Sequence, residues 1–138
     1  MNVLVLQHIV REPPGAFEDI LRQRGASLTR VELDEGEPLP PSLDPFDAVI
    51  AMGGPMSVND TRLHPWLEDE KALIREAVSA GLPFWGSCLG IQLLASALGA
   101  TVSAGPAPEV GVLAVHPTAE GRADPVLGPC RWHCSNAG

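Results

Sequence analysis

A cysteine between two glycines is the residue of this chain best suited to covalent chemistry. Cys88 stands in the run Gly86-Ser87-Cys88-Leu89-Gly90-Ile91-Gln92, between a short apolar stretch and a helical pattern. Such glycines allow a sharp strand-to-helix turn that lifts the central side chain above a sheet. A thiol at the start of a helix faces the positive end of the helix dipole, which favours the attacking thiolate. The motif predicts a nucleophilic Cys88, with the Leu89 N–H placed to donate to an oxyanion. The alternative is a buried structural cysteine.

A second glycine motif follows another apolar run. Gly53-Gly54-Pro55 comes directly after residues 46–52, and its backbone N–H groups could hold a carbonyl oxygen, as in an oxyanion hole. Taken alone, this sequence is equally typical of a tight turn. Because both motifs follow apolar runs of a parallel sheet, they are expected to share one crevice at the carboxyl ends of the strands.

Strands and helices alternate in the pattern over the first hundred residues or so. Apolar and β-branched runs predict strands at residues 2–7, 27–33, 46–52, 82–86, 101–104, 110–115 and 130–133. Helices are predicted from Pro13-Pro14-Gly15 to Gly25, over residues 65–80 and over residues 89–98. This alternation favours βαβ units and an α/β fold with a parallel sheet and helices on both faces.

The helix predicted over residues 65–80 has one apolar stripe. The stripe consists of Leu67, Ile74 and Val78, flanked by Trp66, Leu73 and Ala77. The acids near its start, Glu68, Asp69 and Glu70, are expected to face the positive end of the helix dipole.

Composition excludes several classes of function. The chain has 138 residues and a net charge of −8, so no basic surface for nucleic acid or for anionic membranes is expected. No apolar run approaches the roughly 20 residues that span a bilayer, and no signal peptide is recognised, so a cytoplasmic protein is expected. The odd count of cysteines, with Cys130 and Cys134 flanking His133, supports neither a disulfide framework nor a metal site, and no cofactor is expected.

The two glycine motifs together resemble those of a class I glutamine amidotransferase domain. The resemblance rests on the run from Ala51 to Asp60 (AMGGPMSVND) and on Gly86-Ser87-Cys88-Leu89-Gly90-Ile91-Gln92. Gln7-His8 with Glu12, and Pro108-Glu109-Val110-Gly111-Val112, are also similar to that family. The chain is most similar to stand-alone bacterial members that resemble the glutaminase domain of GMP synthase. The whole chain, 1–138, then forms one incomplete domain of this family, a flavodoxin-like three-layer sandwich with a mainly parallel sheet and a nucleophile elbow.

The resemblance implies a reaction and a role for six residues. Cys88 would attack the side-chain amide of L-glutamine and release ammonia, leaving a thioester that water hydrolyses to glutamate. Gly54 and Leu89 would supply the oxyanion N–H groups, whereas Gly53 and Gln92 would bind the substrate. An ammonia-accepting enzyme would be a separate chain. Glu109 would support the elbow.

The sequence departs from the family at its end. The family uses a His and a Glu two residues apart, well beyond a Trp-His pair that corresponds here to Trp132-His133, and no such motif is present. His116 is followed by Glu120 at the wrong spacing, and His8 and His64 do not match the family base. A truncated product with weak or no glutaminase activity is therefore expected, because losing a positioned base costs about 10²–10⁴ in rate.

Two other functions stay open at this point. One is an inactive pseudo-enzyme that binds glutamine or a partner without turnover. The other is a different cysteine α/β hydrolase, such as a γ-glutamyl hydrolase. The Gly53-Gly54-Pro55 loop together with Gln92 favours the amidotransferase over the second alternative.

Overall fold

The chain forms two units, of which the first holds the sheet and most of the helices. The computed structural model describes residues 1–107, 111, 112 and 116–129. Contacts divide the chain into Met1–Ser103 and Ala104–Gly138, and each unit is described by itself. Within the described residues, no helix is long and apolar enough to cross a membrane.

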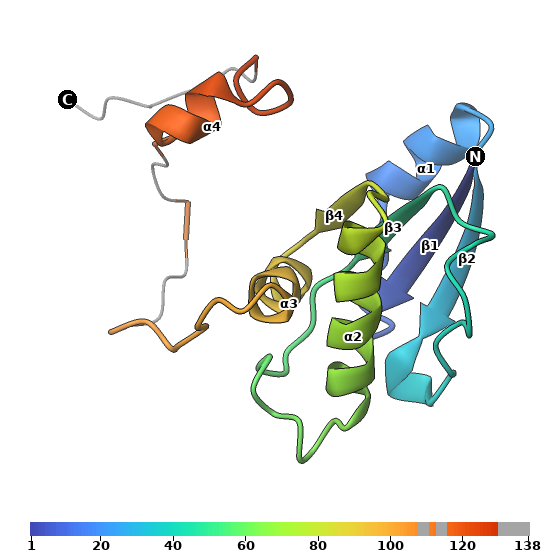
Figure 1. The fold of residues 1–138 in the computed structure, drawn as a ribbon, viewed down its shortest axis with the longest axis horizontal. Helices are drawn as coiled ribbons and strands as arrows, with labels where there is room; N and C mark the ends of the chain where they lie inside the picture. Colours follow the sequence, from blue (N-terminus) through green and yellow to red (C-terminus); the bar gives the residue numbers. More distant parts are fainter. Residues whose placement is uncertain (108–110, 113–115, 130–138) are drawn as a thin grey trace. The chain divides into compact units, whose positions relative to one another are not determined.

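The first unit is built on a parallel sheet of four strands (Figure 1). The strands are β1 (Asn2–Gln7), β2 (Ser27–Glu32), β3 (Ala48–Ala51) and β4 (Phe84–Gly86), in the spatial order β2-β1-β3-β4. Leu6 pairs with Ala51 and Ala51 pairs with Gly86, so the carboxyl ends of three neighbouring strands lie side by side. The loops after β1, β3 and β4 therefore start from one edge of the sheet.

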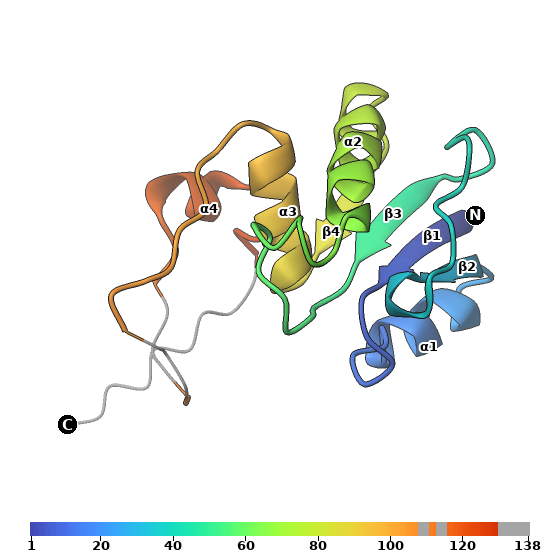
Figure 2. The same cartoon turned by 90° about the horizontal axis from the view of Figure 1, so that it is seen from below.

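Helices cover both faces of this sheet, as the alternating pattern predicts. Figure 2 shows α2 (Trp66–Ser79) and α3 (Leu89–Ala97) on one side and α1 (Ala16–Gln23) on the other. Leu4, Leu6, Val49 and Ala51 pack with Leu73 and Ala77 of α2, whereas Val3, Val5 and Ile50 face the side of Leu21 from α1. Alternate residues of β1 and β3 thus point to opposite layers, which confirms the three-layer α/β arrangement.

Several element boundaries differ from the prediction, for local reasons. The fourth strand starts at Phe84 instead of Leu82, because the N–H of Leu82 bonds back to Ala77 O at 3.0 Å and Pro83 has no N–H. The second strand stops at Glu32, where a 3-10 turn, η1 (Leu33–Glu35), begins and runs to Gly36 in a left-handed conformation.

Residues 101–104 were expected to form a strand, and that prediction is wrong. They are irregular, and the Val102 carbonyl accepts a hydrogen bond from Asn59 Nδ2 at 3.0 Å instead of joining a ladder. The strand predicted over 130–133, and most of the one over 110–115, lie outside the described residues, while Gly111 and Val112 form no strand. In the second unit the described residues include a short helix, α4 (Ala119–Ala123), capped by Thr118 and not predicted from the sequence.

Candidate active site

The turn between β4 and α3, residues 86–90, holds Cys88 in an unusual backbone conformation. Cys88 has φ 50° and ψ −108°, and it is the only non-glycine residue with positive φ in the described part of the chain. A residue with a side chain adopts such a conformation at a cost of about 1–3 kcal/mol, and such residues cluster at functional sites. The thiol is exposed and makes no disulfide. This is the geometry expected of a nucleophile elbow.

Both flanking glycines are required by close backbone packing. A Cβ at Gly86 would lie 2.7 Å from the carbonyl carbon of Gly90, and a Cβ at Gly90 would lie 2.7 Å from the carbonyl carbon of Ala51 and overlap its oxygen. Real Cβ atoms essentially never approach backbone so closely. Because backbone cannot move aside cheaply, neither position accepts a larger residue without shifting the turn.

Hydrogen bonds attach this turn to the end of β3. Ser87 N–H donates to Ala51 O at 3.0 Å, and Gly90 N–H donates to Met52 O at 3.1 Å. Gln92 N–H donates to Cys88 O at 3.3 Å, which ties the first turn of α3 to the elbow. The position of Cys88 is therefore fixed relative to the strand that leads into Gly53 and Gly54.

The Gly53-Gly54 loop lies beside Cys88, as its place in the sequence predicts. A Cβ at Gly53 would lie 3.5 Å from the Cβ of Cys88 and would overlap Oε2 of Glu12. A Cβ at Gly54 would lie 3.1 Å from Cδ2 of Leu89 and 2.9 Å from the Cβ of His8. The loops after β1, β3 and β4 thus meet around the cysteine, and a carboxylate, that of Glu12, lies over Gly53.

A buried histidine supports this loop from behind. His8 is fully buried, and its Nδ1 lies 3.1 Å from Gly53 O while its Nε2 lies 2.9 Å from Oε1 of Glu70. The Trp66 ring stacks on the imidazole at 5.7 Å with an interplanar angle of 16°. Burial alone would lower the pKa of His8, but the hydrogen bond and negative charge of Glu70, with the carbonyls of Gly53 and Met52, raise it above the usual value.

Sequence reasoning missed the pairing of His8 with Glu70. The sequence places Glu70 only among the acids at the start of a helix, whereas the structure shows that this side chain is fully buried. A signal was present, because Glu70 stands three residues after Leu67 on the apolar stripe, where an unpaired charge is very unfavourable. Val78, predicted to lie on the stripe, is only half-buried.

For the other residues named from the sequence, the structure gives few contacts or none. Gln92 is half-buried in the first turn of α3, next to the elbow. His64 tilts against Trp66, with ring centroids 5.6 Å apart, and does not reach the elbow in any described contact. Glu109 and the cluster of Cys130, His133 and Cys134 lie outside the described residues. Among the residues that are described, no three metal-ligating side chains cluster.

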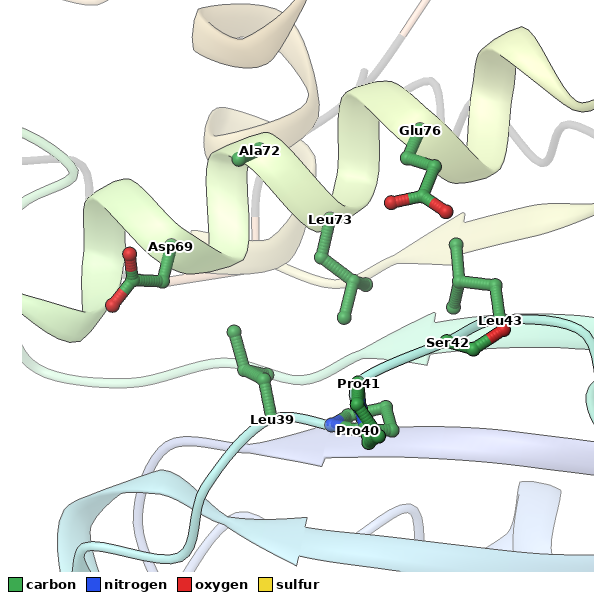
Figure 3. Close-up of a pocket in the computed structure, with 9 residues that line it drawn as sticks. All are labelled: Leu39, Pro40, Pro41, Ser42, Leu43, Asp69, Ala72, Leu73 and Glu76. Carbon is green, nitrogen blue, oxygen red and sulfur yellow. The ribbon is translucent and has the colours of Figure 1, made fainter.

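One cavity is lined by no residue of the elbow (Figure 3). It has a volume of about 250 Å³ and is bounded by the loop over 39–43 and by the Asp69, Leu73 and Glu76 side chains of α2. None of the residues predicted to take part in catalysis lines it. Its walls contain apolar groups and two carboxylates. Because no residue of the elbow or of the Gly53-Gly54 loop lines it, we assign it no part in the chemistry of Cys88.

The chain is thus an α/β protein whose parallel sheet carries, at the ends of neighbouring strands, a cysteine turn and a facing Gly-Gly loop. The family model of glutamine amidotransferase class-I matches residues 16–123. The chain therefore belongs to the class I glutamine amidotransferase family, which confirms the resemblance drawn from the glycine motifs.

Individual relatives agree with this assignment. The glutamine amidotransferase-like protein YfeJ of Salmonella typhimurium is 35% identical over 130 residues, which cover 92% of this chain and 54% of YfeJ. GMP synthase (glutamine-hydrolyzing) of Streptomyces avermitilis is 39% identical over 74 residues, which are 54% of this chain and 13% of that enzyme. The crystal structure of a glutamine amidotransferase from Methylobacillus flagellatus matches with a TM-score of 0.76 and 39% identity. That match covers 80% of this chain and 43% of the solved one, so the chain spans about half the length of such relatives.

Proposed function

We propose that this chain carries the glutamine-attacking half of an amidotransferase site. The observation that carries the proposal is the elbow: an exposed Cys88 with positive φ, held at the strand ends beside the Gly53-Gly54 loop. The substrate is the side-chain amide of L-glutamine. The proposal extends to the cytoplasmic location and to a separate enzyme that accepts the ammonia.

The proposed reaction has two covalent steps. The sulfur of Cys88 bonds to the amide carbon, the C–N bond breaks, and the nitrogen leaves as ammonia with the proton from the thiol. Water then attacks the thioester, which gives glutamate and restores the thiol. In each step the carbonyl oxygen gains negative charge, and the N–H groups of Gly54 and Leu89 would stabilise it. Gly53 and Gln92 would hold the glutamine.

The proposal leaves the proton-transfer base unassigned. None of the four histidines is followed two residues later by a glutamate. His8, which contacts the loop at Gly53, has both ring nitrogens engaged with Gly53 and Glu70 and is fully buried. Without a base in place, turnover falls by about 10²–10⁴, whereas one-step alkylation of an accessible thiolate needs no such group.

Labelling with a diazo-ketone analogue of glutamine tests the proposal. The Cys88 sulfur should bond to the diazo carbon, which takes up the thiol proton as dinitrogen leaves, and mass spectrometry should find the adduct on the Cys88 peptide. Cys88→Ala should give no adduct there, and excess L-glutamine should slow the labelling of the wild type. An analogue that leaves Cys88 unmodified, or that reacts equally fast with glutamine present, contradicts the proposal.

The same measurement separates the alternatives. A pseudo-enzyme that only binds glutamine would protect Cys88 from a general alkylating reagent without reacting with the analogue. A γ-glutamyl hydrolase would react with γ-glutamyl peptides instead, and glutamine would compete poorly.

A further inference from the structure

His8 is a buried titratable group that the proposed reaction leaves unused. It follows β1, and its ring touches the loop after β3 through Gly53 and the helix α2 through Glu70 and Trp66. Its Nε2 lies 2.9 and 3.1 Å from the two carboxylate oxygens of Glu70, and both side chains are fully buried. Three separate elements are thus joined at one imidazole, directly behind the Gly-Gly loop.

We propose that His8 is a positioning residue whose Nδ1–H holds the Gly53 carbonyl, so that the Gly54 N–H is directed at the substrate oxyanion, with Glu70 fixing the ring. The inference rests on the proposed function, because it deepens the role given there to Gly54.

The peptide bond between Gly53 and Gly54 links the carbonyl that His8 holds to the N–H proposed to face the oxyanion. A trans peptide is planar, and its C=O and N–H point in opposite directions. Whatever holds the oxygen of Gly53 therefore sets the direction of the Gly54 N–H. Two adjacent glycines have more backbone freedom than any other pair, so this peptide needs an external constraint to keep one orientation. In the described contacts of the loop, His8 supplies that constraint.

The protons on the His8 ring determine which of its two contacts can be hydrogen bonds. A carbonyl oxygen and a carboxylate both accept hydrogen bonds, whereas a neutral imidazole has only one N–H. Both contacts are satisfied when His8 carries two N–H groups, or when a shared proton lies between Nε2 and Glu70 and Nδ1 keeps its own. In either state the Nδ1–H is retained. Glu70 thus selects the form of the ring that can hold Gly53.

Packing fixes the plane of the His8 ring. Trp66 stacks on it at 5.7 Å with a 16° interplanar angle, and the Cβ of His8 lies against Gly54. The ring has no room to turn away from the loop, because it is fully buried, with Trp66 stacked on its face and Glu70 at Nε2. The support therefore reaches both proposed oxyanion donors through packing.

Two substitutions at His8 separate positioning from simple stability. His8→Asn keeps a nitrogen at the δ position, able to donate to Gly53 O, and abandons Glu70. His8→Gln keeps a nitrogen at the ε position, able to donate to Glu70, and abandons Gly53 O. Both variants lose one contact of a buried pair, so both should be destabilised, and urea unfolding measures by how much.

The readouts follow Cys88 and the Gly54 amide. Acylation of Cys88 by γ-glutamyl p-nitroanilide bonds the sulfur to the amide carbon through an oxyanion and releases p-nitroaniline with the thiol proton. This labelling should slow by about 10²-fold in His8→Gln, the usual effect of removing one oxyanion donor, but by less than about tenfold in His8→Asn. Iodoacetamide instead alkylates the sulfur by displacing iodide and develops no oxyanion, so its rate should stay similar in all three proteins. The ¹⁵N–¹H resonance of Gly54 should move in His8→Gln and stay near its wild-type position in His8→Asn.

Glu70→Gln provides a third variant if either His8 variant fails to fold. A glutamine amide can donate to Nε2, which leaves the Nδ1–H on Gly53 without any charge on the pair. Labelling of Cys88 in Glu70→Gln should then be slower than in the wild type by no more than about a few-fold, because the Gly53–Gly54 peptide keeps its orientation.

The outcomes separate this inference from the proposed function. Labelling that slows equally in His8→Asn and His8→Gln, in line with their stabilities, overturns the positioning role and leaves the proposed function standing. If the wild type is not labelled, the proposed function fails. The Gly54 resonance then decides the inference by itself, because an equal shift in both variants overturns it and a shift in His8→Gln alone supports it.

Discussion

At the scale of single residues, the site depends on glycines that leave room for backbone. Gly90 lies so close to β3 that a Cβ there would overlap the Ala51 carbonyl oxygen, which is itself bonded to the Ser87 N–H. This close packing of backbone is a local requirement and takes no part in the reaction itself. It determines the position of Cys88, and the reactions open to the thiol depend on that position.

Gly90→Ala should displace the elbow. We expect a loss of about 1–3 kcal/mol in the free energy of unfolding, typical of overpacking, and labelling of Cys88 slowed by roughly 10²-fold from misplacement of the thiol. Urea unfolding and the diazo-ketone reaction measure the two effects. Gly105→Ala is the matched control, since a Cβ at Gly105 would lie an ordinary 3.6 Å from its nearest neighbour, Ala107 O. Equal effects at both glycines would contradict the packing argument.

The residues of the site differ in how far the sequence could predict them. Cys88 and its glycines obey a rule that spans five positions, so their spacing alone indicates the turn. His8 and Glu70 are 62 residues apart, and only the folded chain brings the end of β1 against α2. The order of the strands in the sheet decides that contact, and no local pattern encodes it.

At the scale of elements, α2 is the helix that brings a charge into the core. Glu70 reaches His8 from this helix, while its neighbour Lys71 pairs with Glu68 at 3.0 Å. The period of apolar residues predicts α2 well, because a stripe of that spacing must face the sheet. The burial of Glu70 was not predictable from that period, since this acid occupies a stripe position that the pattern reserves for an apolar side chain and is paired with His8 from another element.

The raised pKa of His8 predicts how stability changes with pH. The groups that face the ring are the Glu70 carboxylate and the carbonyls of Gly53 and Met52, and these raise the pKa above the unfolded value of 6.5 despite burial. The stabilisation is therefore complete below the unfolded pKa and is lost as the pH rises through the folded pKa. The free energy of unfolding should fall more steeply above pH 6.5 in the wild type than in Glu70→Gln.

Urea unfolding of both proteins at a series of pH values measures this difference. Ionisable groups other than Glu70 and His8 are common to the two chains, so their effects cancel in the comparison. Parallel curves for the two proteins would show that Glu70 does not stabilise a protonated His8.

At the scale of the whole molecule, the sheet and every residue assigned to the site except Glu109 belong to the unit Met1–Ser103. The class of fold was predictable because alternating strands and helices allow few arrangements. The irregular course of residues 101–104 was not, since the Asn59 side chain takes up the Val102 carbonyl that a strand would have paired.

A chain ending after Ser103 should keep the site. We expect cooperative urea unfolding and labelling of Cys88 within about threefold of the full chain, because compact units with their own core often fold independently. Circular dichroism and mass spectrometry measure the two properties. A large loss of labelling with intact folding would show instead that residues 104–138 support the elbow, which is the role that the resemblance implies for Glu109.

The positive φ of Cys88 has a consequence for how such a chain changes over generations. Glycine would adopt this backbone conformation without strain. Every descendant that keeps the cysteine therefore keeps the backbone strain of a residue with a side chain at positive φ. Selection for folding alone favours its replacement. A lineage that no longer needs the thiol should therefore replace the cysteine by glycine early. This chain still has a cysteine at position 88.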